Sequence, residues 1–275
     1  MMITGLEAGG KMLDFDRLSC DNIRMENIPE STPSAPPAGM KYWRSYSYFF
    51  DNPKWTMNLL LGAVCSLIPV LGGIFFSGYG YEAVEAMHRR GEDDQYPDFD
   101  FNRFVKYLVR GCWPFIWQLV VGVPVGFIMG FLYFIGMMVF IGTADQHEHG
   151  PPAAFFLFFI FFLVVGLALG LIISVVLAPL LLRSGLSQEL GFGQALPFVQ
   201  DFLKRVGKEV ILAQLFLLGT AIVIIPIAYV LCILPVFPAV VIVQMAHFHL
   251  LYQLYGLYLQ RGGMPVPLQL ETVPG

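Results

Sequence analysis

The fold of this chain is decided by long charge-free stretches such as AAFFLFFIFFLVVGLALGLIISVVLAPLLL at residues 153–182. A helix that crosses the hydrocarbon core of a bilayer needs roughly 20 mostly apolar residues, and a charge at its centre costs about 2.5–3.5 kcal/mol. Further stretches free of Lys, Arg, Asp and Glu occupy residues 57–80, 112–142, 210–236 and 239–259. The sequence therefore predicts an all-α, polytopic transmembrane bundle with about five spans.

The composition agrees with lipid as the surrounding medium. Hydrophobic residues make up 56% of the chain and charged residues only 13%, whereas soluble domains carry about a quarter charged residues. The net charge of −4 is spread over tails and loops, so nothing indicates nucleic-acid binding. The four cysteines show no CxxC spacing. We therefore expect no disulfide framework, no metal site and no cofactor.

The chain divides into three expected regions. Residues 1–40 form a polar tail with the run ESTPSAPP at 30–37, which predicts disorder. Residues 41–261 form the transmembrane domain. Residues 262–275 are a short C-terminal tail, in which Gly262, Gly263 and Pro265 end the last helix.

Two polar connections carry similar basic segments, PDFDFNRFVKYLVRG from Pro97 and PFVQDFLKRVGKEV from Pro197. In each, apolar residues recur at helical spacing opposite a basic side, which predicts an amphipathic helix on an anionic lipid surface. The expected headgroup contacts come from Arg103, Lys106, Arg110, Lys204, Arg205 and Lys208. A shift of 102 positions aligns Arg103 with Arg205, Lys106 with Lys208 and Pro124 with Pro226, which indicates an internal duplication.

The positive-inside rule places both basic connections in the cytoplasm. Residues 81–111 and 183–209 hold nine Lys and Arg residues, and the alternate connections hold none. However, a full first crossing would place Lys41, Arg44 and Lys54 outside. Two interpretations therefore stand: the first stretch crosses the bilayer, or it re-enters and is broken in the run IPVLGG at 68–73.

Small residues and prolines give the expected packing of the spans. Glycines at four-residue spacing form one ridge at Gly122, Gly126 and Gly130 and another at Gly166 and Gly170, and we expect these ridges to face each other. Pro69, Pro124 and Pro226 are expected to kink their helices. The carbonyls freed at Pro124 and Pro226 could line a cavity, or the prolines could have only a geometric role.

The polar clusters are interpreted as structural. The loop DQHEH at 145–149 groups metal-ligand residue types but lacks a partner to complete a zinc shell, so we expect a solvated turn. Asp98 or Asp100 is expected to cap a helix. His247 and His249 lie on nearly opposite helix faces and cannot chelate a metal together. We expect one of them to hydrogen-bond across the bundle to Gln214, Gln244 or Gln253.

Residues 46–111 resemble a known family. The features are DNPKW at 51–55, Ile68-Pro69 with Gly72, Gly78-Tyr79, RRGED at 89–93, Pro97 with Asp98 and Phe99, and Gly111. This order is similar to the multi-pass membrane proteins of bacteria and archaea known as domain of unknown function 4013. The resemblance implies a prokaryotic inner-membrane location and supplies no activity or catalytic residue.

Two function classes compete. The first is a non-catalytic, membrane-organising or accessory protein that contacts the bilayer, anionic headgroups and an unidentified membrane-protein partner. The second is a transporter or channel for an uncharged or apolar substrate, which a polar-lined cavity at mid-membrane would favour. No GxSxG, Walker, HExxH or kinase motif occurs, so we do not expect an enzyme.

Overall fold

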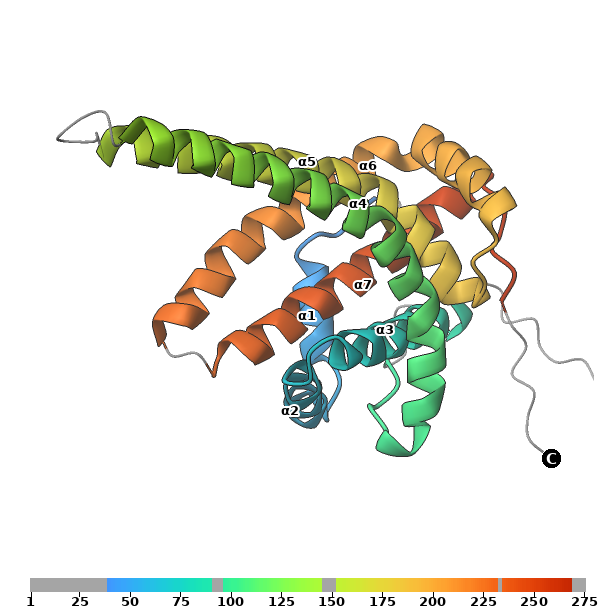
Figure 1. The fold of residues 1–275 in the computed structure, drawn as a ribbon. Helices are drawn as coiled ribbons and strands as arrows, with labels where there is room; N and C mark the ends of the chain where they lie inside the picture. Colours follow the sequence, from blue (N-terminus) through green and yellow to red (C-terminus); the bar gives the residue numbers. More distant parts are fainter. Residues whose placement is uncertain (1–38, 91–95, 145–151, 232–233, 269–275) are drawn as a thin grey trace, which may run out of the picture. The chain divides into compact units, whose positions relative to one another are not determined.

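The computed structural model describes residues 39–90, 96–144, 152–231 and 234–268, all within one compact unit at residues 33–275. Almost all of the polar tail expected at 1–40 and the whole DQHEH loop lie outside the described residues. The described residues form helices and no strand, which confirms the all-α class (Figure 1). The elements are α1 (Arg44–Phe50), α2 (Trp55–Ser66), α3 (Leu71–Arg90), η3 (Phe101–Arg103), α4 (Phe104–Ala144), α5 (Pro152–Ser187), α6 (Phe192–Leu231) and α7 (Val236–Gln260).

Four of the described helices, α4 to α7, are long and apolar enough to cross a bilayer. They correspond to the last four predicted spans. The first predicted span is different, because residues 57–80 are divided between α2 and α3. α2 has 12 residues, and α3 carries Glu82, Glu85, Arg89 and Arg90 in its second half.

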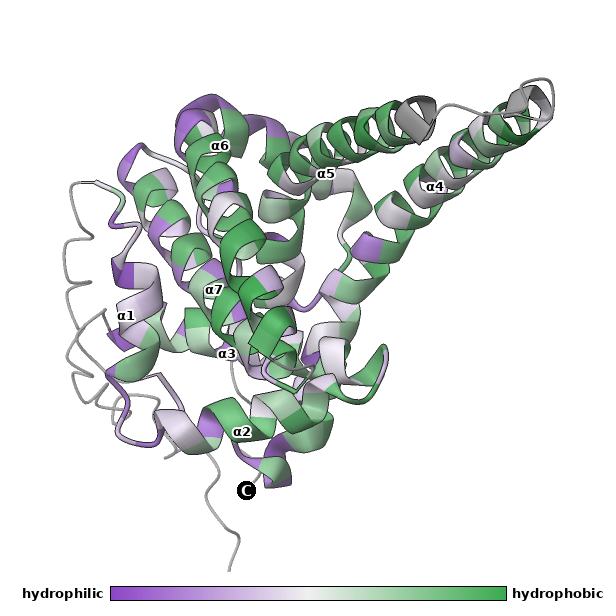
Figure 2. Ribbon diagram, turned by 90° about the vertical axis from the view of Figure 1, so that its left-hand side faces the viewer, coloured by the Kyte–Doolittle hydropathy of each residue, from purple (hydrophilic) through white to green (hydrophobic). Residues whose placement is uncertain are grey.

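The first apolar stretch is broken near its middle. Pro69 and Val70 lie between α2 and α3, and Val70 adopts the left-handed conformation with φ 64°. The backbone is tight at this break, since a Cβ on Gly72 would lie 1.8 Å from the Cys65 carbonyl oxygen, and α2 and α3 run in clearly different directions (Figures 1 and 2). A break at this place is what the re-entrant interpretation expects. The side of the membrane on which the three preceding cations lie stays a prediction.

α7 is the helix on which most others pack, because it contacts α1, α2, α3 and α6. The residues just before α1 are tied to it by a polar contact as well: the Lys41 backbone N–H donates to the Gln253 side-chain oxygen at 2.7 Å. The rings of Tyr48 and His249 also lie 4.5 Å apart. The second half of α7 is accordingly buried on all sides.

The four long helices form two antiparallel pairs, α4 with α5 and α6 with α7. Ring contacts join the second half of α4 to the first half of α5, where the ring centroids of Tyr133 and Phe162 lie 5.6 Å apart. At the start of α4 and the end of α5, the Arg110 Nε donates a hydrogen bond to the Gly185 carbonyl at 2.9 Å. The two pairs diverge toward their connecting turns (Figure 1), and the diverging parts are strongly hydrophobic (Figure 2). This divergence opens the space described next.

Candidate binding cavity

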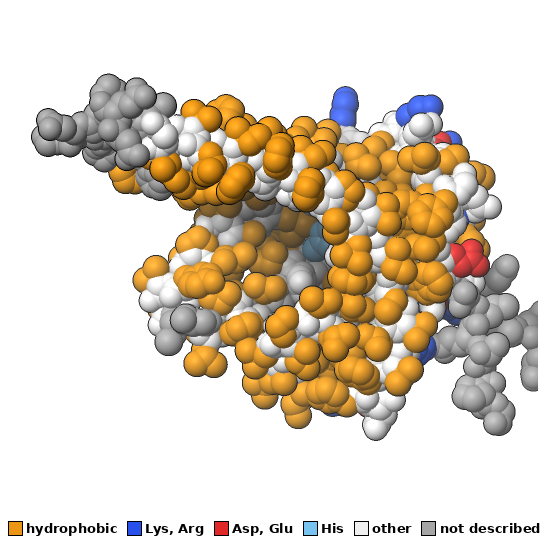
Figure 3. Space-filling view, in the orientation of Figure 1, with side chains coloured by type: hydrophobic (Ala, Val, Ile, Leu, Met, Phe, Trp, Pro, Cys, Tyr) orange, Lys and Arg blue, Asp and Glu red, His pale blue; other side chains and the backbone are white. Residues whose placement is uncertain are grey.

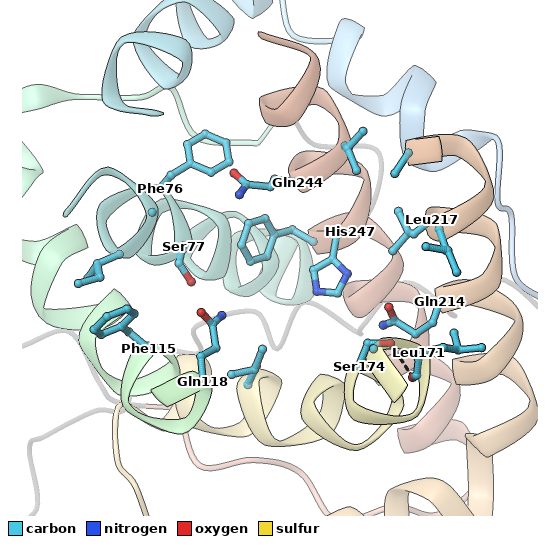
Figure 4. Close-up of a pocket in the computed structure, with 18 of the residues that line it drawn as sticks. Phe76, Ser77, Phe115, Gln118, Leu171, Ser174, Gln214, Leu217, Gln244 and His247 are labelled. Atoms are coloured by element: carbon cyan, nitrogen blue, oxygen red, sulfur yellow. Dashed lines mark hydrogen bonds between the residues drawn. The ribbon is translucent and has the colours of Figure 1, made fainter. Parts of the chain in front are cut away.

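A cavity of about 640 Å³ lies among α3, α4, α5, α6 and α7 (Figure 4). This volume is within the range of small-molecule sites, which is about 300–1,000 Å³. Figure 3 shows the surface hollowed between the α4–α5 pair and the α6–α7 pair, with a hydrophobic rim and a histidine visible inside. Because the flanking helices are candidate membrane spans, the hollow opens on a face that hydrocarbon would cover.

The wall of the cavity is mostly apolar and carries a few uncharged polar side chains. Each of the five helices contributes at least one of them: Ser77, Gln118, Ser174, Gln214, Gln244 and His247. No Asp, Glu, Lys or Arg belongs to the wall that the described residues form. The lining chemistry therefore suits a neutral molecule that is largely apolar and has a few hydrogen-bonding atoms.

Helical periodicity explains why these residues face the same space. On α5 the lining residues include Gly166, Gly170 and Ser174, which recur every four positions, and on α7 Gln244 and His247 are three apart. Gly166 and Gly170 add room, because a Cβ at either position would meet nothing within 4 Å. The sequence singled out Gln214, Gln244 and His247 only as internal hydrogen-bonding groups. It missed Ser77, Gln118 and Ser174, although an amide within a charge-free span was a usable signal.

The predicted contact between glycine ridges is not present. A Cβ at Gly122, Gly126, Gly130, Gly166 or Gly170 would meet no atom within 4 Å, so none of these glycines sits in a tight helix contact. The close glycine contacts lie elsewhere: a Cβ on Gly78 would be 1.8 Å from the Tyr107 carbonyl, and one on Gly111 would be 1.8 Å from that of Ile74. Glycine spacing permits close approach on a helix face, but it does not specify which neighbour uses that face.

Two of the predicted lipid-contacting arginines point into the protein. Arg110 is 2% exposed and donates to the Glu85 carboxylate at 2.6 Å, and Arg103 pairs with Glu82. These contacts tie α4 to α3, and the bond from Arg110 to Gly185 adds α5. Arg103 and Arg110 are therefore corrected from headgroup contacts to internal ion pairs. The sequence pattern identified the basic residues correctly, but carboxylates of α3, rather than lipid headgroups, bind these two arginines.

The first predicted interfacial helix is not a separate element. Residues 97–100 form no helix, η3 follows, and α4 then runs without interruption from the basic segment into the span. Asp100 accepts a hydrogen bond from the Asn102 N–H at 2.9 Å, as expected for a capping residue. Lys106 on α4 is half-buried.

The second basic segment lies in the first half of α6, and a kink at Val206, with φ −129° and ψ 16°, divides it. Arg205 binds Asp201 at 2.9 Å on the same helix. Lys204 and Lys208 are exposed and keep the position expected for headgroup contact. The proposed duplication is seen only in the shared order of basic segment and span, so it stays a prediction.

The prolines behave differently from one another. Pro69 lies in the break between α2 and α3, as expected. Pro124 and Pro226 lie inside continuous helices, and the one non-helical residue recorded within α6 is Val206 rather than Pro226. Neither Pro124 nor Pro226 lines the cavity, which agrees with the alternative that these prolines have only a geometric role.

The two histidines of α7 have different surroundings. His249 is buried and shares a hydrogen bond at 3.0 Å with Gln253, on the same helix rather than across the bundle. His247 lines the cavity and makes no hydrogen bond to a described residue. No group of three or more metal-ligating side chains occurs among residues that the structure describes.

The comparisons with known proteins give a family. Residues 61–244 match the family described as Protein of unknown function (DUF4013). The chain belongs to this family. The matched part includes every cavity-lining residue except His247 and Phe248. No curated protein and no solved structure was found to match the chain.

Proposed function

We propose that this DUF4013 member is a non-catalytic, multi-pass membrane protein that binds an uncharged, largely apolar molecule in the cavity. The observation that carries the proposal is the neutral, sparsely polar wall built from five helices. A charged ligand would need a counter-charge in the wall, because burying an unpaired charge is costly. A ligand with no polar atom would leave the glutamine amides that line the cavity without partners.

The position of the hollow supports entry from the bilayer. It lies between the two helix pairs, and its rim consists of hydrophobic side chains (Figure 3). A lipid-like molecule could therefore enter sideways without passing through water. This route suits a ligand that is already dissolved in the membrane.

The arrangement of the serines supports a binding role rather than catalysis. Nucleophilic catalysis by serine needs a base within hydrogen-bond reach of its hydroxyl. The Ser174 hydroxyl instead donates to the Leu171 carbonyl at 2.8 Å, and Ser77 makes no hydrogen bond to His247. We therefore propose that the polar residues of the cavity bind a ligand through hydrogen bonds and do not react with it.

The remaining expectations complete the proposal. The cell membrane is the proposed location, with the basic connections in the cytoplasm. There Lys204 and Lys208 would attract anionic headgroups by about 1 kcal/mol each. We also propose an unidentified membrane-protein partner, to which this protein would present the bound molecule. Transport of an uncharged or apolar substrate is the second candidate, favoured by the same cavity.

Filling the cavity tests the proposal. Gly170→Phe would project a ring into the open space, whereas Gly122→Phe adds the same ring on α4 away from the cavity. Native mass spectrometry of protein released from membranes should find a neutral molecule on the wild type and on Gly122→Phe. The Gly170→Phe variant should lack it. If the wild type and both variants all lacked a bound molecule, or if all carried the same bound molecules, the proposal would be contradicted.

A further inference from the structure

Four polar side chains of the cavity make no hydrogen bond to any residue that the structure describes. They are the amides of Gln118, Gln214 and Gln244 and the imidazole of His247. Gln214 is only 7% exposed and lines the cavity. Gln244 and His247 are half-buried, and Gln118 is exposed on the cavity wall. Because the flanking helices are candidate membrane spans, hydrocarbon around the hollow would offer these groups no hydrogen bond. A ligand with polar atoms would therefore stabilise them.

Apart from Gln244, the polar side chains of α3, α4, α6 and α7 that line the cavity lie on two opposing sides of it. Figure 4 shows Ser77 of α3 and Gln118 of α4 on one side of the cavity, and Gln214 of α6 and His247 of α7 on the other. A ligand that satisfies both sides must carry hydrogen-bonding atoms at two opposite edges. A molecule with a single polar atom would reach one side only.

The space between these sides is lined by aromatic rings. Phe76, Tyr81, Phe115 and Phe248 all belong to the wall. Tyr81 and Phe248 already meet edge to face, with ring centroids 5.1 Å apart. Aromatic rings favour contact with another flat ring through offset stacking or edge-to-face packing. The middle of the ligand is thus expected to be flat.

We infer, on the basis of the proposed binding function, that the ligand is a p-quinone with an apolar tail. Its two carbonyl oxygens lie on opposite edges of a flat, uncharged ring. They would accept hydrogen bonds from Gln118 on one side and from Gln214 on the other. The tail would leave through the hydrophobic hollow between the helix pairs and stay in the bilayer (Figure 3).

Other neutral membrane molecules fit less well. A polyprenol has one hydroxyl group, which pairs with one side of the cavity and leaves the other unpaired. A diacylglycerol has enough oxygens, but it has no flat ring for the aromatic wall. Phospholipids carry a phosphate, and the described wall has no cation to pair with it.

Equilibrium binding in quinone-free lipid nanodiscs tests the inference. A short-tailed p-quinone, a polyprenol and a diacylglycerol would each be titrated against the wild type and three variants. Gln118→Leu and Gln214→Leu remove one amide from each side and keep the size of the side chain. Gln200→Leu is the matched control, because Gln200 is exposed on α6 and lies away from the cavity.

The expected result is that the quinone binds at least tenfold more tightly than the other two molecules. Each cavity substitution should weaken quinone binding at least tenfold, and Gln200→Leu should leave it unchanged. Equal or tighter binding of the polyprenol or diacylglycerol overturns the quinone inference but leaves the proposed function standing. Quinone affinity that is insensitive to both cavity substitutions also overturns the inference. Absence of binding by all three molecules counts against the proposed function itself.

Discussion

Arg110 is a buried cation near the start of α4, and its charge is compensated from two directions. Glu85, itself 12% exposed, binds its guanidinium at 2.6 Å, and the Gly185 carbonyl accepts from Nε at 2.9 Å. Removing one partner of such a pair leaves the other buried and unpaired. We expect Arg110→Met to lower the free energy of unfolding by about 3–5 kcal/mol, measured by thermal unfolding in detergent.

The matched control for Arg110 is a more exposed ion pair. Arg44 and Asp51 lie 2.7 Å apart with side chains 35% and 48% exposed. Arg44→Met should cost less than about 1 kcal/mol, as exposed pairs do. If the two substitutions had equal effects, the buried network would have no special role.

Asp98 gives a pH dependence outside the spans. The Lys54 ammonium donates to its carboxylate at 2.7 Å and the Asn52 amide donates at 3.2 Å, which together hold the pKa of Asp98 below its usual value of 3.8. A lowered pKa means that the fold favours the charged form, so this contribution is present above about pH 4 and is lost as the pH falls further.

We therefore expect the unfolding temperature of the wild type to fall between pH 5 and pH 3 more steeply than that of Asp98→Asn. Lys54→Met removes the main donor and should flatten the curve in the same way. Thermal scans across this pH range provide the measurement. Identical slopes for all three proteins would show that the pair does not contribute.

Among the elements, the α3–α4 contact depends most strongly on glycine. A Cβ on Gly78 or Gly111 would lie 1.8 Å from a carbonyl oxygen of the facing helix, so the two backbones must separate if either glycine gains a side chain. We expect Gly78→Ala and Gly111→Ala each to lower the free energy of unfolding by about 1–3 kcal/mol. Gly126→Ala, which faces open space, should be close to neutral. Denaturation in detergent separates these outcomes, and a loss at Gly126 equal to that at Gly78 would contradict the contact.

The same elements show what sequence could and could not predict. Charge-free length identified α4 to α7, and Pro69 marked the break between α2 and α3, because both signals are local. Helix partners were predicted poorly. The ridge at Gly122 has the spacing of a contact face but meets no atom within 4 Å, whereas Gly78 and Gly111, without that spacing, form a close contact between helices. The choice depends on residues such as Tyr107, far along the chain.

The cavity itself could not be predicted, for a related reason. Gln214 and His247 stand out in the sequence as polar residues within apolar spans. The simplest expectation is that they form a hydrogen bond with each other or with another polar residue of the bundle. They remain unpaired because the two helix pairs diverge, and divergence is a property of the assembled helices. The sequence therefore indicated the polar residues but not the space that they line.

For the whole molecule, the re-entrant interpretation of the broken α2–α3 stretch predicts the sides on which the connections lie. Single cysteines would be introduced into a variant without the native cysteines. Lys41→Cys reports on the segment before α1, Glu189→Cys on the α5–α6 connection and Leu234→Cys on the α6–α7 connection. On this interpretation a re-entrant first stretch and two crossings separate the first two sites, so Lys41→Cys and Glu189→Cys should be labelled from the same side. Leu234→Cys should be labelled from the opposite side. Shared accessibility of Lys41→Cys and Leu234→Cys would instead indicate a full first crossing.

The central claim is that the space between the two helix pairs holds one kind of neutral molecule in the living membrane. Leu171 lines the cavity, and its neighbour Ile172 is 60% exposed on the outer face of the same helix. A photoreactive benzophenone side chain at each position, activated in intact cells, tests the claim most directly through the mass of the adduct. The account predicts a single neutral adduct at position 171 and a mixture of bulk phospholipids at position 172. The same phospholipid mixture at both positions would contradict it.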